Sequence, residues 1–499
     1  MPPIQLFGEA VSLTRHIESM PPSLALFLWL VILVVLLRFD PAKSSTISVA
    51  LWVPVIWIFI IGSRLPSQWL SWGMTTVSAA LEEGNPVDRT INSALILFAI
   101  GILVSRSFNW ETFISRNLAL AAFLSFALVS VVWSDFPFIA FKRWFRDLGN
   151  YLMILVTLSE AHPLEAVRAV LRRLCYLLIP LSVVLVKYFP EISKQYDPWT
   201  GIATYGGAAT SKNMLGVACL VSGLFLFWDT VTRWSKRKER RTKLILALNI
   251  GFIAMVLWLL NLSNSATSRV CLALGCMIIA AAHAKTFQRH PRFLKGLIPT
   301  CLCLFLILSF GFDVKGQVAG AVGRDPTLTD RTKIWDVLLH MHTNPLLGTG
   351  YESFWLGPRL QEVWSQVGVI NEAHNGYLEV YVNLGLIGLL LLIAFLISSY
   401  RTICKRLDAS YGFGSLQLSM WTILLIYNCT EAAFKGQLMW VVFLLGAIDV
   451  PVRRKNGLHT MARARTRNSA KGIPSSALEI KVSGDALEDS RRRISHNWV

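Results

Sequence analysis

The segment Asn371-Glu-Ala-His-Asn-Gly-Tyr-Leu-Glu-Val-Tyr-Val-Asn-Leu-Gly-Leu-Ile-Gly-Leu389 joins a long polar stretch to an apolar run that continues to Leu396. This order predicts a membrane-spanning helix whose mouth is polar. At helical spacing Asn375, Glu379 and Asn383 share one face. Polar groups at such a depth are costly unless they face protein, water or a ligand. An interfacial belt of Tyr and His is one interpretation, and a functional site is the other.

The composition predicts an all-α polytopic integral membrane protein. The chain has 499 residues, of which 54% are hydrophobic. Apolar runs long enough to cross a bilayer recur along most of it, which excludes a soluble multidomain protein. The excess of Lys and Arg (48) over Asp and Glu (30) is expected in cytoplasmic loops and does not indicate nucleic-acid binding. The N-terminus lacks the pattern of a cleaved signal peptide.

We predict about 11–13 transmembrane helices, with a long extracytoplasmic loop before a late helix. The candidate spans are Pro22–Leu37, Ile47–Gly62, Ile91–Ser105, Leu118–Trp133, Leu148–Leu158, Cys175–Tyr188, Met214–Trp228, Leu244–Leu262, Val270–Ala284, Leu297–Phe312, Tyr377–Ile397, Leu416–Tyr427 and Met439–Val450.

Basic connections predict the orientation of these spans. Thr232–Lys243 is rich in Lys and Arg and is therefore expected in the cytoplasm. Alternation then places the following segments outside: Ser63–Thr90, Ser134–Asp147, Phe189–Asn213 and Gly311–Glu372. The polar helix mouth lies on that outer face.

Two further segments are expected in the cytoplasm. Ser159–Arg173 has the pattern of a short amphipathic helix. The tail Pro451–Val499 is basic and poor in apolar residues, so we expect it to be disordered near anionic headgroups. The multi-span domain therefore covers residues 1–450. All 8 cysteines lie in predicted spans or a basic loop, so neither a disulfide framework nor a zinc cluster is expected.

The long outer segment predicts a helix that covers a cavity. Thr327 or Thr329 would cap it, and Pro345 and Gly348 would end it. Arg331 in the first turn is unfavourable for the helix dipole, but a guanidinium there suits a bound phosphate. An ion pair with Asp325 or Asp330 is the alternative. The apolar side of this helix is Ile334, Val337, Leu338 and Met341.

Several other basic residues depart from the positive-inside rule. They are Lys142, Arg143, Arg146, Lys212 and Arg269, all in predicted outer connections. One such residue carries little information, but several around one face indicate an anionic ligand. A lipid-linked diphosphate is the natural candidate.

A metal site is the competing chemistry for the histidines. His340 and His342, with His374, Glu372 and Glu379, are potential ligands. However, residues two apart on a helix point about 200° apart. The chain contains neither a DxD pair nor an HExxH motif. We therefore expect no metal and no cofactor.

These stretches together resemble the O-antigen ligase and polysaccharide polymerase superfamily, especially its exopolysaccharide-production polymerases. One departure is Asp330, where these polymerases often have Gly before the Arg. The matching residues, in family order, are Trp133-Ser-Asp-Phe-Pro137, Ser211-Lys-Asn-Met-Leu-Gly216, Ser268-Arg269, Gly323-Arg-Asp-Pro-Thr-Leu-Thr-Asp-Arg331 with Trp335, Pro345-Leu-Leu-Gly-Thr-Gly-Tyr351, His374-Asn-Gly-Tyr-Leu-Glu379 with Gly385 and Gly388, and more weakly Thr430-Glu431.

The resemblance implies a GT-C-like membrane glycosyltransferase with its core at residues 133–396. It implies metal-independent, inverting transfer from an undecaprenyl-diphosphate-linked glycan donor to a glycan acceptor. By the same resemblance His374 takes the acceptor proton, and Arg269 and Arg331 bind the diphosphate. A neutral imidazole with a pKa near its normal value is compatible with that role. We assign Arg143, Arg146 and Lys212 to the diphosphate as well, and Asn375, Tyr377, Glu379 and Trp335 to supporting the site.

A polymerase of lipid-linked repeat units in the bacterial inner membrane, active on the periplasmic face, is therefore the leading hypothesis. A ligase that hands the glycan to a lipid A core would carry the same motifs. A transporter of glycolipid or of a small anion is the alternative of another class, and it should show broken helices deep in the bundle. Expected partners are the bilayer, a chain-length regulator and export machinery, but no nucleic acid.

Overall fold

Helices build almost all of the chain that is described by this computed structural model, which covers residues 20–38, 40, 47–70, 84–196, 201–300 and 331–450. A helix hydrogen-bonds its own backbone, as a segment in a bilayer must. Within the described residues the strands are a single antiparallel pair, β1 (Lys194–Tyr196) and β2 (Ala203–Tyr205), in which Lys194 lies opposite Tyr205. The all-α membrane fold expected from the sequence is confirmed.

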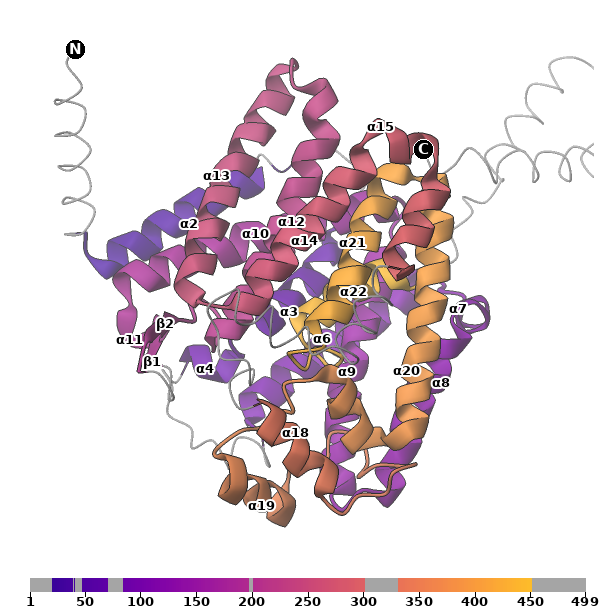
Figure 1. Ribbon diagram of the computed structural model, residues 1–499. Coiled ribbons are helices and arrows are strands. Elements are labelled where there is room, and N and C mark those ends of the chain that lie inside the picture. The colour runs from indigo at the N-terminus through magenta and orange to yellow at the C-terminus, as the bar shows by residue number, and fades with distance from the viewer. Residues whose placement is uncertain are drawn as a thin grey trace, which may run out of the picture.

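Figure 1 shows the arrangement of the helices. In chain order they are α2 (Pro22–Arg38), η2 (Val49–Leu51), α3 (Trp52–Gly62), α4 (Pro66–Leu70), α6 (Pro86–Ser105), α7 (Trp110–Arg116), α8 (Leu118–Val129), η3 (Ser130–Trp133), α9 (Pro137–Leu158), α10 (Pro163–Tyr188), α11 (Pro190–Ser193), α12 (Lys212–Arg233), η4 (Trp234–Lys236), α13 (Arg240–Ser263), α14 (Ala266–His283), α15 (Lys285–Arg289), α18 (Arg331–His340), α19 (Gly357–Val367), α20 (Gly376–Ala409), α21 (Tyr411–Tyr427) and α22 (Leu438–Ala447).

The predicted spans coincide with helices wherever they fall on described residues. By length and apolar composition, 6 of these helices can cross a membrane, namely α6, α10, α12 with η4, α13, α14 and α20, and up to 7 if α7 and α8–η3, bent by 98°, form one span. Helices α2, η2–α3 and α22 are apolar but shorter. The total of about 11–13 spans, which includes such short helices, stays a prediction. The predicted span 297–312 and the basic tail lie largely or wholly outside the described residues.

The short helix predicted at Ser159–Arg173 is wrong in its length. Helix α10 begins at Pro163, within the predicted stretch, and continues to Tyr188, while residues 159–162 belong to the connection before it. Arg172 is buried and pairs with Asp229 of α12 at 2.7 Å. The charges that indicated an exposed helix are thus neutralised between packed helices, so the amphipathic pattern does not mark a separate element.

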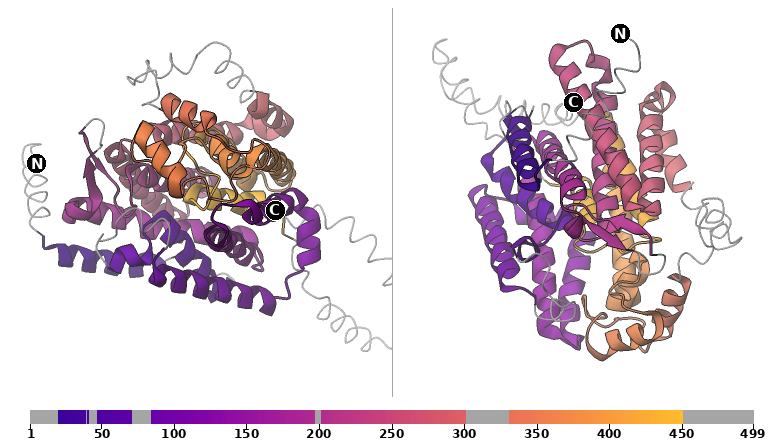
Figure 2. Two further views of the ribbon diagram at one scale, coloured as in Figure 1. Left: turned by 90° about the horizontal axis from the view of Figure 1, so that it is seen from below. Right: turned by 90° about the vertical axis from the view of Figure 1, so that its left-hand side faces the viewer.

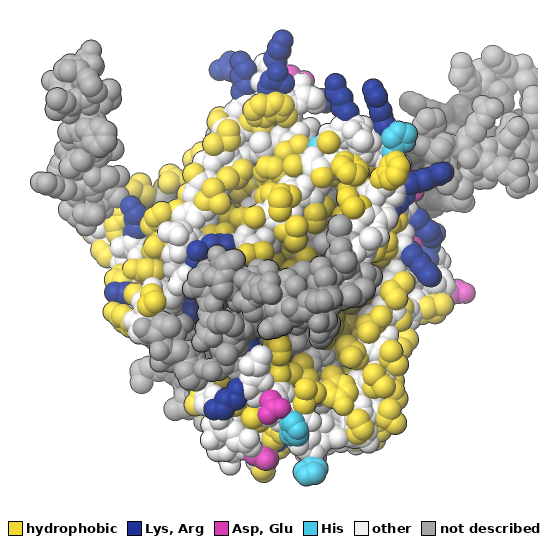
Figure 3. Space-filling model, viewed as in Figure 1, with side chains coloured by type: hydrophobic (Ala, Val, Ile, Leu, Met, Phe, Trp, Pro, Cys, Tyr) yellow, Lys and Arg dark blue, Asp and Glu magenta, His cyan; other side chains and the backbone are white. Residues whose placement is uncertain are grey.

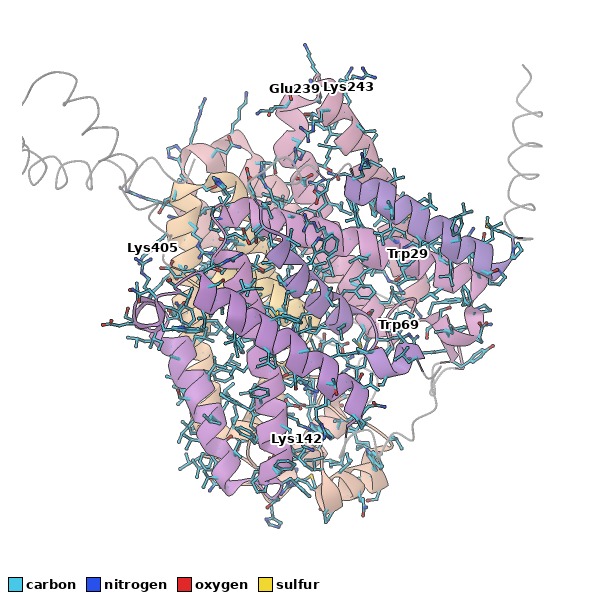
Figure 4. All side chains as sticks on the ribbon, turned by 180° about the vertical axis from the view of Figure 1, so that it is seen from behind. Trp29, Trp69, Lys142, Glu239, Lys243 and Lys405 are labelled. Atoms are coloured by element: carbon cyan, nitrogen blue, oxygen red, sulfur yellow. The ribbon has the colours of Figure 1, made fainter. Side chains whose placement is uncertain are left out.

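The basic and polar ends of the molecule lie apart. The tip between α12 and α13 is at the top of Figure 1, whereas α18 and α19 are at the foot, and the side view on the right of Figure 2 agrees. Apolar side chains cover much of the face between these ends (Figure 3). Seen from behind, Glu239 and Lys243 mark the upper end and Lys142 the lower (Figure 4). This separation is compatible with the predicted orientation.

The outer loop inserts into a break in α20. Gly385 has φ 64° and ψ −167° within this helix, a conformation that side chains other than glycine rarely adopt. The backbone groups freed there bond to the loop, because Leu386 N–H donates to the Pro345 carbonyl (2.9 Å) and Gly350 N–H to the Asn383 carbonyl (2.9 Å). The Pro345–Gly350 loop is thereby fixed against the membrane helix.

Gly385→Ala should therefore lower thermal stability. The new Cβ would lie 2.2 Å from the Leu346 carbonyl oxygen, and the positive φ adds strain, so a loss of about 2–4 kcal/mol is expected. Unfolding of the detergent-solubilised protein, followed by tryptophan fluorescence, measures it. Gly251→Ala in α13 is the control, since nothing lies within 4 Å of its Cβ. Equal melting temperatures for the two variants would contradict the constraint.

Candidate functional site

His374 occupies a turn immediately before α20. Its φ of 49° lies in the left-handed region, which is uncommon for a residue with a side chain and often marks a functional constraint. Asn375 then caps the helix, because its side-chain oxygen accepts hydrogen bonds from the N–H groups of Tyr377 (3.0 Å) and Leu378 (3.1 Å). Asn375, for which we predicted a supporting role, is thus the N-cap of α20. The cap fixes the backbone beside His374 and hence the direction of the imidazole.

Two carboxylates lie near one nitrogen of the His374 imidazole. Nδ1 lies 3.2 Å from Oε1 of Glu372 and 3.6 Å from Oε2 of Glu431. Nδ1 makes no hydrogen bond of normal geometry, so these contacts are ion pairs. The side chain of His374 keeps 26% of its surface exposed, which leaves the ring open to a substrate.

Glu431 also binds the guanidinium of Arg331. Nη2 of Arg331 donates to Oε1 of Glu431 at 2.9 Å, and Nη1 donates to the carbonyl of Thr430. The amide of Asn213 donates to both oxygens of the same carboxylate at 3.3 Å. The predicted pairing of Arg331 with Asp325 or Asp330 involves residues outside the described part of the chain, and in this structure its carboxylate partner is Glu431.

The carboxylates change the protonation state of the histidine. Burial alone lowers the pKa of His374, but Glu372 and Glu431 outweigh it and raise this pKa to about 9. Burial likewise raises the pKa of Glu372, and the neighbouring His374 imidazole more than reverses this, so that the pKa falls to about 2. At neutral pH the resting site therefore holds an imidazolium beside two carboxylates. The expectation of a near-normal histidine pKa is corrected accordingly.

Glu379 supports His374 through the backbone. Its Oε2 accepts a hydrogen bond from the N–H of Ala373 (2.8 Å), and its Oε1 lies 3.3 Å from the ammonium of Lys435. Trp335 of α18 donates its Nε1–H to the carbonyl of Ala373 (2.9 Å). The N–H and the carbonyl of Ala373 are thus both hydrogen-bonded. Glu379 supports His374 in this way without contacting its ring.

Tyr377 contributes packing and one hydrogen bond. Its hydroxyl donates to the carbonyl of Leu425 (3.1 Å), and its ring meets that of Phe434 edge to face with centroids 5.1 Å apart. Leu425 lies in α21, and Phe434 follows in the connector between α21 and α22. Tyr377 therefore fixes α20 against the connector that carries Glu431.

Arg269 and Lys212 lie on helix ends beside the same connector. Arg269 is exposed in the first turn of α14, where Thr267 and Thr430 join hydroxyls at 3.0 Å. Lys212 begins α12 and precedes Asn213, which contacts Glu431. The structure thus places both predicted cations on elements that touch Thr430-Glu431.

Arg143 and Arg146 lie at a second position, on α9. Arg143 donates to the carbonyl of Glu352, and Nε of Arg146 lies 3.3 Å from Oδ1 of Asp147. Asp147 also accepts a hydrogen bond from the hydroxyl of Tyr351 (2.8 Å). Asp147, Tyr351 and Glu352 line an internal cavity that Glu379 and Lys435 also border. In this structure Arg146 thus pairs with a carboxylate that lines this cavity, and Arg143 binds the backbone of another lining residue.

One group of possible metal ligands exists among the described residues. The ligand atoms of Glu372, His374 and Glu431 lie within 4.8 Å of one another. The guanidinium of Arg331 already contacts a Glu431 oxygen, however, and would repel a cation bound there. The predicted alternative ligand His340 lies elsewhere, with its Nδ1 3.4 Å from Asp336. The donor set fits a metal by distance but poorly by charge.

The sequence assigned no role to three residues that the structure puts at the centre of this site. Glu431 entered only as a weak signature, Glu372 only as a possible metal ligand, and Asn213 as part of a motif. The signal that was available for Glu431 is a carboxylate that closely follows an apolar run. Such a charge needs a partner from another element.

Comparisons with known proteins agree with the motifs. Residues 250–393 match a family model described as O-Antigen ligase. The "Exopolysaccharide production protein ExoQ" of Rhizobium meliloti (strain 1021) is 26% identical over 300 residues, which are 57% of this chain and 65% of that protein. The aligned part is thus less than two thirds of the relative's length. The resemblance to the O-antigen ligase and polysaccharide polymerase superfamily is confirmed.

Glu431→Gln should lower the pKa of His374 from about 9. The amide keeps the shape and removes one of the charges that favour the imidazolium. NMR titration of histidine-labelled protein in nanodiscs measures this pKa, and His162→Ala identifies a background signal. Because the folded pKa is raised, the stabilisation holds below the unfolded pKa and is lost as pH rises through about 9. An unchanged titration in Glu431→Gln would disprove the coupling.

Proposed function

We propose that this protein is a membrane glycosyltransferase that polymerises undecaprenyl-diphosphate-linked repeat units into an exopolysaccharide or O-antigen-type polymer. The observation that carries the proposal is the joint position of His374, Arg331 and Glu431 at the polar mouth of α20. A proton acceptor and a phosphate-binding guanidinium lie on two sides of one carboxylate. The family match and the exopolysaccharide relative support the polysaccharide chemistry.

The proposed reaction is a single inverting displacement. The acceptor hydroxyl oxygen bonds to the anomeric carbon of the donor, and the bond from that carbon to the diphosphate breaks. Neutral His374 takes the hydroxyl proton, and the diphosphate leaves with the bonding electron pair. With a pKa of about 9, only a minor fraction of His374 is neutral at pH 7. The neutral imidazole is a stronger base for the same reason, and this offsets part of the rate lost to its low population.

The arginines stabilise the leaving group. Negative charge grows on the diphosphate in the transition state, and guanidiniums fixed beforehand stabilise that charge without reorganisation. Arg331 is bound to Glu431 in the resting site, so the diphosphate competes with this carboxylate for the guanidinium. Arg269, which is exposed at the start of α14, supplies the second positive charge, and Lys212 adds to the same field.

A ligase is the second candidate, favoured by the description of the matching family as O-Antigen ligase. It would use the same donor chemistry and a lipid A core or other acceptor. In either case we place the reaction on the periplasmic side of the bacterial inner membrane, since α18, which carries Arg331, lies at the end opposite the basic α12–α13 tip (Figure 1). A chain-length regulator and export machinery are the proposed partners.

His374→Ala and Arg331→Ala should each abolish polymer formation. The first removes the proton acceptor and the second a leaving-group contact, so transfer should fall by at least about 100-fold. Purified protein in liposomes is given labelled lipid-diphosphate repeat unit, and product length is read on a gel. His162→Ala and Lys333→Ala, both exposed, are the matched controls.

The same assay separates the candidates. A ladder that both site variants lose supports a polymerase. Label that transfers only when a lipid A core is added supports a ligase. Label that merely crosses the bilayer, in wild type as in His374→Ala, would show that the protein is a transporter and that the proposed reaction is wrong.

Thorough chelation should leave transfer unchanged. Arg331 already faces Glu431, and guanidiniums neutralise the diphosphate in place of a metal ion. The liposome assay is repeated after dialysis against EDTA, with an EDTA-sensitive glycosyltransferase run in parallel. Loss of activity that one added divalent ion restores would instead assign Glu372, His374 and Glu431 as metal ligands.

A further inference from the structure

A polar groove lies between α18 and α19 on the outer side of the molecule. Its free volume is about 490 Å³, within the range of pockets that bind small ligands. The polar side chains that line it are Asp336, His340, His342, Arg359, Glu362 and Gln366. Neither the proposed reaction nor the core uses these side chains.

The lining can both donate and accept hydrogen bonds. Gln366 and the two histidines can do both, while the carboxylates of Asp336 and Glu362 accept. Within the described part of the chain, the side chains of Glu362 and Gln366 have no hydrogen-bond or ion-pair partner, whereas Arg359 is paired with Asp135 at 2.8 Å. Such a surface suits a ligand that carries many hydroxyl groups, each of them donor and acceptor.

Charge and polarity exclude other classes of ligand. Two carboxylates and one arginine already paired with Asp135 give no positive surface for a phosphate. Val337, Met341 and Pro358 are the three apolar residues among the nine that line the groove. They can contact the C–H faces of sugar rings, but the six polar residues beside them do not suit a lipid chain. The ligand that fits is a glycan.

The groove is connected to the reactive site through α18. That helix begins at Arg331, and Asp336–His340 lie about 8–14 Å further along its axis at 1.5 Å per residue. Trp335, in the same helix, binds the carbonyl of Ala373 next to His374 (2.9 Å). A glycan whose terminal sugar reacts at His374 would therefore have its more distant sugars at the groove.

We propose that this groove is a glycan subsite that holds the distal sugars of the chain being extended. The inference rests on the proposed function and adds a determinant of acceptor length to it. Binding energy from distal sugars keeps a long acceptor in place between transfers. An acceptor too short to reach the groove gains none of it.

The test compares a long and a short acceptor, soluble oligosaccharides of several repeats and of one repeat. The variants are Glu362→Ala/Gln366→Ala in the groove and the control Gln361→Ala/Ser365→Ala, exposed on the same helix outside it. Wild type and control should prefer the long acceptor by about tenfold in kcat/KM. The groove variant should lose that preference and keep the kcat/KM of the short acceptor.

Two results would overturn the subsite. One is a groove variant that keeps the full preference for the long acceptor. The other is a groove variant whose kcat/KM falls equally for the long and the short acceptor. If wild type transfers no sugar, the proposed function fails, and the groove is then tested by binding alone. Binding of the long oligosaccharide to wild type in nanodiscs, reduced about tenfold in the groove variant, would uphold the groove. No binding to wild type would reject it.

Discussion

A single buried carboxylate, that of Glu431, connects the elements that form the candidate site. The side chain of Glu431 is 6% exposed, and a charge at that depth needs partners of opposite charge. It pairs with two cationic groups, Arg331 of α18 and His374 before α20, and it accepts hydrogen bonds from the neutral amide of Asn213 in α12. Without it, a guanidinium and an imidazolium would face each other. The positions of the outer helix, the histidine turn and α12 therefore depend on one another.

The second constraint is the way in which the outer loop is attached to α20. The break at Gly385 exposes backbone groups that the Pro345–Gly350 loop satisfies, and Glu379 and Trp335 hold the peptide groups of Ala373. A site carried by a loop is usually mobile, and precise chemistry needs rigid support. Here the membrane helix supplies that support, so the histidine keeps its direction although it lies outside any regular element.

The arrangement also divides the charges around the candidate site. Arg331, Arg269 and Lys212 lie on elements around Thr430-Glu431, where a diphosphate is expected. Arg143 and Arg146 accompany the carboxylates of the neighbouring cavity instead. The groove between α18 and α19 has no unpaired arginine among its lining residues. A donor with a diphosphate and an acceptor with only hydroxyl groups would thus meet surfaces of different chemistry on the two sides of α18.

The sequence by itself determined the membrane class, the positions of most helices, α18 with its buried Ile334 and Leu338, and the resemblance to the polysaccharide polymerase superfamily, because hydropathy and motifs are local properties. It was wrong about Ser159–Arg173, whose charges are neutralised by helices distant in sequence. Only the tertiary structure joined Arg331 to Glu431, 100 residues apart, and thereby decided the role of Glu431 and the raised pKa of His374. Ion pairs form across space between elements, and no local pattern encodes which charges meet.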